Sequence, residues 1–250
     1  MKPVVLSKRL QAVADMVTTG NRVCDVGCDH GFVPIYLVQQ GISPTVLAMD
    51  VKSGPLSAAK AHISEQGMEN VIETRMSDGL HNYNIGESDT LICAGMGGRL
   101  MMRILSDDRA KTESFRELIL QPQSEIEQFR AWLRGQGYCI VEENMIEEDG
   151  KFYPMMRVET MPKLDNTCDD LKDAEFCKLI DRYGPFLLFN KNQTLIAYLE
   201  REIGIYEGIL SELAAQGLSE EKHKKRYEEV HNSLEDCRKA MDIAALTEQS

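Results

Sequence analysis

The 250-residue sequence lacks most of what marks a membrane-spanning, secreted or wholly basic protein. None of its apolar runs approaches the roughly 20 residues that a helix needs to cross a bilayer, so we expect no membrane span. Lys8, Arg9 and Asp15 interrupt the first apolar residues, which predicts an amphipathic helix rather than a signal peptide. The net charge of −12 excludes nucleic-acid binding over the whole surface but allows a local basic face.

A disulfide framework is also missing, because the seven cysteines are odd in number and irregular in spacing. This number and spacing of cysteines are typical of a protein whose thiols stay reduced, so we expect a cytoplasmic protein. Cys24 and Cys28 could form half of a metal site, but no second pair stands at ligand spacing, so we expect no metal. Hydrophobic residues make up 43% of the chain, which allows an ordinary core without disulfides or metals.

Strand and helix patterns alternate over the first 158 residues. Short apolar strands are predicted at 22–26, 46–49, 71–75, 89–93, 117–121, 138–142 and 152–158, and helices at 6–18, 32–40, 55–66, 99–105 and 126–136. The acidic segment 143–151 is expected to join the last two strands. This order predicts an α/β fold with helices on both faces of a mainly parallel sheet, ending in a hairpin.

The composition changes after residue 162, so we predict one domain at 1–162 and a second at 163–250. A helix is expected at 166–182. Apolar residues then follow at alternating spacings of three and four, first within 196–213 and again within 227–244. This pattern favours an antiparallel coiled-coil hairpin, with two ordinary helices packed on the sheet domain as the alternative.

The stretch VCDVGCDHG, residues 23–31, leads from the first strand to a helix, as in doubly wound folds that bind nucleotides. The dinucleotide fingerprint would need glycine where the chain has Asp29 and Phe32, and an aspartate would repel a pyrophosphate. No GK[ST] segment follows, which excludes a Walker-type loop. An acidic turn suits a cationic ligand without phosphate, such as S-adenosylmethionine, which carries a sulfonium, an amino group and one carboxylate.

Three aspartates stand at the ends of three successive predicted strands, the edge where doubly wound folds bind their ligands. Asp25 can reach the ammonium group of the cofactor, Asp50 can accept both ribose hydroxyls, and Asp78 can accept from the adenine amino group. Asp50 alone could be a helix cap and Asp78 alone a turn residue, but the three in order predict a cofactor site. The other cofactor candidates in these turns are Gly27, Cys28, His30, Gly31, Val51, Gly79, Ala94 and Gly95.

The segment AGMGG, residues 94–98, ends the fourth predicted strand, at the corner where class I methyltransferases hold the methyl acceptor. The Asn/Asp-Pro-Pro-aromatic motif that often serves methylation of exocyclic amino groups is absent here. The glycines expose backbone groups and leave room for a flat base, and they also fit a tight turn. Gly95 and Met96 are therefore candidate catalytic residues.

DVGCDHG, the Met49–Asp50 pair, SDGL and AGMGG together resemble the bacterial tRNA (adenine-N1)-methyltransferase family called TrmK. LSKRL near the start, QGY, GKFYPM and the C-terminal helices extend the resemblance over the whole chain. It implies a class I methyltransferase fold, Rossmann-like, with seven strands of which the last is antiparallel. It also implies methyl transfer from S-adenosylmethionine to N1 of adenine 22 in the D-arm of tRNA, and it places Arg9 beside the cofactor pocket.

The implied chemistry needs alignment and charge stabilisation more than a base, because N1 of adenine has an in-plane lone pair and the product ring is cationic. Asp29 is the candidate catalytic carboxylate facing the acceptor, although it could instead only bind the cofactor or cap the following helix. His30 is assigned to the cofactor, with a turn residue or an acceptor ligand as alternatives.

A base held in a tRNA arm must swing out before its N1 can react. Tyr153 is the candidate for stacking on it and Lys151 for a phosphate contact; both could be ordinary strand residues. A basic run could contact tRNA phosphates or be a solvated helix face; its members are Lys222, Lys224, Lys225 and Arg226. We expect a monomer. The alternative functions are methylation of a small molecule or protein, and a non-catalytic cofactor-binding adaptor.

Overall fold

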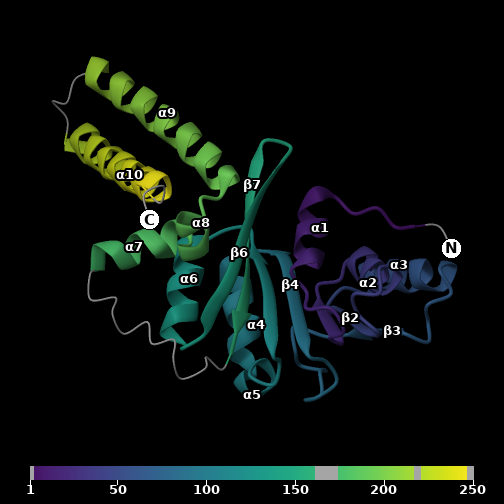
Figure 1. Cartoon of the computed structure of the whole chain (residues 1–250). Coiled ribbons are helices and arrows are strands. Elements are labelled where there is room, and N and C mark those ends of the chain that lie inside the picture. Colours follow the sequence, from purple (N-terminus) through teal and green to yellow (C-terminus); the bar gives the residue numbers. More distant parts are fainter. Residues whose placement is uncertain (1–2, 161–173, 217–220, 247–250) are drawn as a thin grey trace. The chain divides into compact units, whose positions relative to one another are not determined.

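A seven-stranded sheet forms the centre of the first part of the chain (Figure 1). Its strands are β1 (Val23–Val26), β2 (Val46–Asp50), β3 (Ile72–Met76), β4 (Thr90–Met96), β5 (Glu117–Pro122), β6 (Cys139–Glu148) and β7 (Lys151–Glu159). They lie in the order β3-β2-β1-β4-β5-β7-β6. The first five pair in parallel, and β7 is antiparallel to both β5 and β6. The predicted seven-stranded fold with an antiparallel last strand is confirmed.

Helices cover both faces of this sheet. One face carries α1 (Lys8–Asp15), α2 (Phe32–Gln39) and α3 (Ser53–Glu65), and the other carries α4 (Gly98–Asp107), α5 (Arg109–Thr112) and α6 (Ile126–Gly135). Successive strand residues enter opposite cores because side chains alternate along a strand. Val23 and Ile92 pack with the first group of helices, whereas Cys24 and Leu91 pack with the second. Burial on both faces explains the continuous apolar runs in the sequence.

The β6–β7 hairpin is longer than the sequence pattern predicted. Most of segment 143–151, expected as a connection, belongs to β6, whose pairing with β7 runs as far as Glu148 opposite Lys151. Only Asp149 and Gly150 turn the chain, both with positive φ (51° and 70°), as a two-residue hairpin turn requires. The acidic residues concealed this strand in the sequence because charged residues are usually exposed, whereas Glu143 is 8% exposed and its carboxylate accepts a hydrogen bond from the buried Arg130 (2.8 Å).

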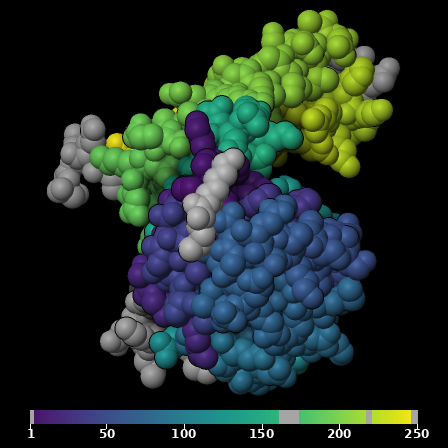
Figure 2. Space-filling model, turned by 90° about the vertical axis from the view of Figure 1, so that its right-hand side faces the viewer, coloured from purple at the N-terminus to yellow at the C-terminus, as the bar shows by residue number. Residues whose placement is uncertain are grey.

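The computed structural model describes residues 3–160, 174–216 and 221–246. The chain divides into two compact units, residues 1–170 and 171–250. The predicted boundary between residues 162 and 163 lies outside the described residues, as does the first part of the helix predicted at 166–182. In Figure 2 the blue surface belongs to the first unit and is formed by α3, β3 and the segment after β3.

The second unit is helical. It contains α7 (Ala174–Tyr183), α8 (Pro185–Phe189), α9 (Gln193–Gln216) and α10 (Glu221–Leu246). The antiparallel pair α9 and α10 packs through a cluster of side chains that the three–four spacing predicted: Ile203, Tyr206, Leu210, Tyr227, Val230 and Leu234. α10 also packs on α7, where Asp236 accepts hydrogen bonds from Lys178 (2.7 Å) and Arg182 (2.9 Å). That α9 and α10 form a true coiled coil stays a prediction. Among the described residues, no helix has the length and apolarity needed to cross a membrane.

Candidate active site

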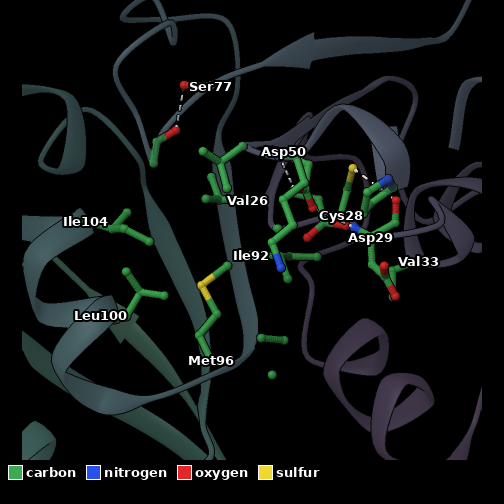
Figure 3. A pocket seen from close by; sticks show the side chains of 18 of the residues that line it. Val26, Cys28, Asp29, Val33, Asp50, Ser77, Ile92, Met96, Leu100 and Ile104 are labelled. Carbon is green, nitrogen blue, oxygen red and sulfur yellow. Dashed lines mark hydrogen bonds between the residues drawn. The ribbon is translucent and has the colours of Figure 1, made fainter. Parts of the chain in front are cut away.

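A cavity of about 560 Å³ opens at the carboxyl ends of β1, β2 and β4 (Figure 3). Loops that follow parallel strands meet at this edge of a doubly wound sheet. The cavity brings together Arg9, Asp25, Gly27, Cys28, Asp29, His30, Asp50, Val51, Asp78, Gly79, Ala94, Gly95 and Met96. All of these residues were predicted from the sequence to contact the cofactor or the methyl acceptor.

Asp50, at the end of β2, is held in one orientation. It is 9% exposed, and its two carboxylate oxygens accept hydrogen bonds from the backbone N–H groups of Asp29 (3.2 Å) and Lys52 (2.8 Å). The carboxylate therefore ties the loop after β1 to the start of α3. It retains further lone pairs that can accept hydroxyl protons from a ligand.

Asp25, inside β1, is a buried acid without a fixed partner. It is 5% exposed, and no described residue donates a hydrogen bond to its carboxyl group. Burial, together with the nearby charge of Asp50, raises the pKa of Asp25 to about 7. A positively charged ligand group would stabilise the ionised form of Asp25 and offset its repulsion from Asp50, so this end of the cavity favours a cation.

Gly27 allows the loop after β1 to lie against the end of β4. Its φ is 81°, and a Cβ at this position would collide with Met96 Cε. The Met96 Sδ lies 3.7 Å from Cys93 Sγ, and the Met96 methyl group lies directly against Gly27. Any larger residue at position 27 would push this side chain away or fill the cavity.

Gly31 was predicted to bind the cofactor, but it does not line the cavity. It caps the start of α2 at a φ of 76°, and a Cβ there would lie 3.0 Å from the Ala59 Cβ of α3. In this structure Gly31 therefore serves the close packing of α2 on α3.

Asp78 lines the cavity from the loop after β3, but its carboxylate already has a protein partner. Its Oδ1 accepts a hydrogen bond from Arg103 Nη2 at 2.9 Å, and both side chains are more than half exposed. Arg103 comes from α4 and also lines the cavity. The ion pair joins the loop after β3 to α4 at the cavity mouth and leaves the second carboxylate oxygen of Asp78 available.

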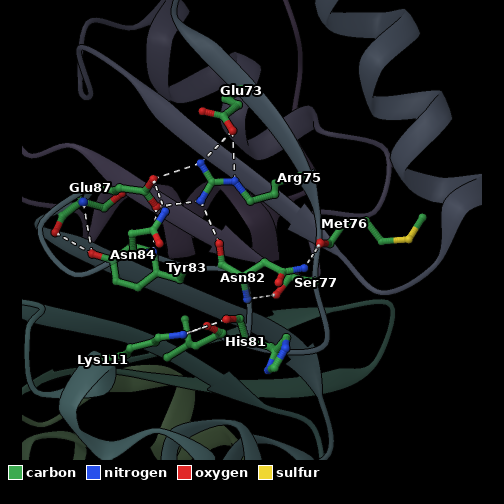
Figure 4. Close-up of polar contacts among 12 residues, drawn as sticks. Glu73, Arg75, Met76, Ser77, His81, Asn82, Tyr83, Asn84, Glu87 and Lys111 are labelled. Carbon is green, nitrogen blue, oxygen red and sulfur yellow. Dashed lines mark hydrogen bonds and ion pairs between the residues drawn. The ribbon is translucent and has the colours of Figure 1, made fainter.

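The loop that carries Asp78 and Gly79 is braced by Arg75 (Figure 4). The Arg75 guanidinium donates to the carboxylates of Glu73 and Glu87 and, at 2.9 Å, to the carbonyl oxygen of Asn82. Hydrogen bonding to Arg75 lowers the pKa of Glu87 to about 2, so this carboxylate stays charged at neutral pH.

Lys111 holds the same loop from the other side. Its Nζ donates to the carbonyl oxygens of Leu80 (3.1 Å) and His81 (2.7 Å). Together Arg75 and Lys111 hold the loop at residues 80–82 and at Glu87, although neither side chain reaches the cavity.

Gly95 forms a bulge near the end of β4. Its φ is 79°, and the pairing with β5 shifts register between Ala94 and Met96. The Gly95 N–H donates to Oε1 of Gln121 (3.2 Å), and Arg9 Nη1 donates to the same oxygen (2.9 Å). The fully buried Gln121 thus joins the AGMGG segment to α1.

Asp29 lies at the mouth of the cavity. It has a left-handed backbone (φ 49°), which is uncommon for a residue other than glycine, and its side chain is 71% exposed. The carboxylate Oδ1 lies 3.6 Å from Nε2 of His30. The Asp29 carboxylate is thus accessible to a molecule that approaches from solvent, whereas its backbone N–H is engaged by Asp50.

Comparison with known proteins agrees with this geometry. Residues 6–156 match the family described as a methyltransferase domain. The tRNA (adenine(22)-N(1))-methyltransferase of Bacillus subtilis (strain 168) is 30% identical over 242 residues, 97% of this chain and 99% of that protein. The crystal structure of the B. subtilis m1A22 tRNA methyltransferase TrmK, also 30% identical, covers 96% of this chain and 100% of its own, with a TM-score of 0.80.

The chain belongs to the TrmK family of methyltransferases. The resemblance noted in its sequence motifs is thereby confirmed. The TrmK of M. capricolum, solved in complex with S-adenosylhomocysteine, is 28% identical, covers 96% of this chain and 99% of its own, and has a TM-score of 0.78. The similarity to the TrmK proteins includes the helical unit, because it extends over nearly the full length.

The predicted tRNA contacts lie outside the cavity. Lys151 is exposed, and Tyr153 is half-buried with its ring centroid 5.6 Å from the Arg9 guanidinium carbon. Tyr153 therefore touches a residue that lines the cavity without lining it itself. The basic residues of the helical unit are exposed along the start of α10: Lys222, Lys224, Lys225 and Arg226.

Sequence reasoning missed several residues of the site, namely Lys52, Ser77, Leu100, Arg103, Gln121 and Gln123. For Gln121 a signal existed, since a glutamine inside the apolar strand ELILQP must find hydrogen-bond partners when buried. For Arg103 no signal existed, because the helix pattern does not show which surface side chain reaches the next loop.

Proposed function

We propose that this chain transfers a methyl group from S-adenosylmethionine to N1 of adenine 22 in the D-arm of tRNA. The observation that carries the proposal is its near-full-length identity of 30% to the tRNA (adenine(22)-N(1))-methyltransferase of B. subtilis. The aspartates that line the cavity at the carboxyl edge of the sheet support it, because a sulfonium and an ammonium group are stabilised by nearby carboxylates.

The cavity fits this cofactor in residue types and in space. We assign the ammonium group to Asp25, whose buried carboxyl has no hydrogen-bond partner among the described residues, and the ribose hydroxyls to the oriented carboxylate of Asp50. The adenine amino group is assigned to the Asp78 oxygen that Arg103 leaves available. The remaining contacts are assigned to the glycine loop and to neighbouring backbone: Gly27, Cys28, His30, Val51, Gly79 and Ala94.

S-adenosylmethionine, when bound, supplies an electrophilic methyl group. The N1 lone pair of the substrate adenine lies in the ring plane, so the protein has to align the ring rather than remove a proton. Gly95 and Met96 form the wall at the end of β4 where we place the adenine. The exposed Asp29 carboxylate stabilises the positive charge that grows on the ring or accepts from its amino group.

The tRNA is proposed to contact residues beyond the cavity. Tyr153 and Lys151 lie on β7, and Tyr153 adjoins the cavity through Arg9. The exposed basic residues of α10 are assigned to tRNA phosphates, because clustered basic side chains are uncommon in a chain with a net charge of −12. The proposed enzyme acts as a cytoplasmic monomer and needs no metal, since the direct transfer of a methyl group from a sulfonium to a free lone pair requires no Lewis acid.

The proposal is tested by incubating the protein with labelled S-adenosylmethionine and unmodified tRNA transcripts, then mapping the modified base. A transcript that carries guanine at position 22 is the matched control. The expected product is one N1-methyladenine at position 22 and none in the control. Label in protein or metabolites, with none in tRNA, would contradict the proposal and favour the small-molecule or protein alternative.

A further inference from the structure

Three aromatic rings gather beside the cavity. The rings of Phe32 and His62 are stacked, with centroids 4.9 Å apart and planes 20° from parallel. The His30 ring lies 6.0 Å from Phe32 and 6.1 Å from His62. We refer to His30, Phe32 and His62 as the ring cluster. It brings the first residue of α2 together with the third turn of α3.

The backbone holds the ring cluster in place. The close approach of Gly31 to Ala59 fixes the start of α2 against α3. His62 Nδ1 lies 3.0 Å from the carbonyl oxygen of His30. Because a carbonyl oxygen can only accept, Nδ1 carries the proton in this contact. The stacked geometry is therefore fixed before any ligand arrives.

The ring cluster is accessible and continuous with the cavity. Phe32 is 41% exposed although phenylalanine is usually buried, and His62 covers only one of its faces. Phe32 and His30 line the cavity, and so does the exposed Lys52, which can supply a phosphate contact. An open ring face beside a lysine is the combination that proteins use to bind unpaired bases of RNA.

The position of the ring cluster separates it from the reacting base. β2 and α3 lie on one side of β1, whereas β4, with Gly95 and Met96, lies on the other. The ring cluster belongs to the α3 side. It therefore suits a different nucleotide from the one held at the end of β4.

We propose that the ring cluster stacks an unpaired tRNA base that neighbours the methylated adenine. The inference rests on the proposed function in taking tRNA as the substrate. A base that leaves its helical stack also unstacks its neighbours. The open face of Phe32 receives one of them, which holds the arm open and sets the position of the target ring.

The test is a double-mutant cycle between protein and RNA. Phe32→Leu keeps apolar bulk but removes the ring, and Phe32→Tyr restores it. Ile85→Ala removes an exposed apolar side chain outside the cavity and serves as the control. Each protein is titrated, with S-adenosylhomocysteine present, against a tRNA transcript and against transcripts that are abasic on one or the other side of adenine 22. Affinity for S-adenosylhomocysteine is measured separately.

With the intact transcript, Phe32→Leu is expected to weaken RNA binding by roughly 5- to 150-fold, the range found for loss of one base–aromatic stack. Phe32→Tyr should recover most of this loss, and Ile85→Ala should cause none. One abasic transcript should bind the wild-type protein as weakly as Phe32→Leu binds intact RNA. Combining that transcript with Phe32→Leu should add little further loss.

Additive losses for both abasic transcripts, or an unchanged affinity of Phe32→Leu for intact RNA, would overturn the inference. Methylation of the intact transcript separates this result from a failure of the proposed function. If the wild-type protein methylates adenine 22 and the losses are additive, only the ring-cluster inference fails. If the losses from Phe32→Leu and from one abasic transcript are not additive but adenine 22 is not methylated, only the proposed function fails. Absence of both binding and methylation would overturn both.

Discussion

Burial and, to a lesser extent, the nearby charge of Asp50 raise the pKa of Asp25 to about 7. Asp25 is the last but one residue of β1 and Asp50 is the last residue of the adjacent strand β2, and the two carboxyl groups differ in their hydrogen-bond partners. Asp50 accepts two backbone hydrogen bonds, whereas Asp25 accepts none from the described residues. The pair therefore stores unfavourable electrostatic free energy that a bound cation can release.

Asp25→Asn is expected to stabilise the protein at neutral and alkaline pH in the absence of cofactor. The folded pKa lies above the ordinary value of 3.8, so the folded state binds this proton more tightly than the unfolded state. The free energy of unfolding contributed by Asp25 is then largest below about pH 4 and falls as the pH rises to about 7. At pH 8 the variant should gain up to about 4 kcal/mol in free energy of unfolding.

Urea denaturation of wild type and Asp25→Asn at pH 5 and pH 8 measures this effect. The expected result is a difference in free energy of unfolding that favours the variant more at pH 8 than at pH 5. Asp15→Asn, at an exposed position on α1, is the control and should show no such dependence. A difference that is the same at both pH values would contradict the assigned pKa.

Asp50→Ala is expected to weaken cofactor binding by roughly 100-fold or more, since it removes two charge-assisted hydrogen bonds to the ribose. It also frees the backbone of Asp29 and Lys52, so the loop should become less ordered. Calorimetric titration with S-adenosylhomocysteine checks the affinity, and circular dichroism checks that the variant is folded. Unchanged binding by a folded variant would refute the ribose assignment.

Arg75→Gln is expected to raise the KM for S-adenosylmethionine by roughly 5-fold while leaving kcat nearly unchanged. Arg75 does not line the cavity, but its hydrogen bonds to Glu87 and Asn82 brace the loop that carries Asp78. Arg116→Gln, which removes an exposed arginine from an ion pair with Asp89, is the control. Hydrogen exchange in residues 77–88 should increase for Arg75→Gln alone. If that segment keeps its protection, the bracing role is wrong.

Replacing the four basic residues of α10 is expected to weaken tRNA binding and reduce its salt dependence. Four lost phosphate contacts should lower the slope of log affinity against log salt by about 3. The variant combines Lys222→Ala, Lys224→Ala, Lys225→Ala and Arg226→Ala. Lys60→Ala with Arg116→Ala removes exposed charge from the first unit as a control. If the slope falls by the same amount per removed charge in both variants, the effect is one of overall charge and α10 has no specific role.

The sequence predicted most of the cavity for a physical reason. Asp25 and Asp50 lie at or next to the carboxyl ends of β1 and β2, and Asp78 follows β3. Parallel strands bring their carboxyl ends to one edge of the sheet. No knowledge of helix packing was needed to place them together. The left-handed backbone of Asp29 could not be predicted from the strand pattern, because the Asp29 N–H is fixed by a hydrogen bond to Asp50 on a different strand.

Contacts between distant segments were not predictable. Arg9 and Gln121 are 112 positions apart in the chain, and their hydrogen bond depends on how α1 packs against β5. The Arg103–Asp78 pair depends likewise on the rotation of α4. In the β6–β7 hairpin, however, the Asp149–Gly150 pair is a local sequence signal for a two-residue turn. It would have predicted that β6 extends as far as Glu148.

Calorimetric titration of S-adenosylmethionine into the full chain at pH 6 and pH 8 tests the central claim, that the Asp25–Asp50 cavity binds a cationic cofactor. Wild type should bind at both pH values and more tightly at pH 8, by up to about tenfold, because Asp25 must lose its proton to receive the ammonium group. Asp25→Asn should bind weakly and without this pH dependence. Affinity that is independent of pH and unaffected by Asp25→Asn would contradict the account.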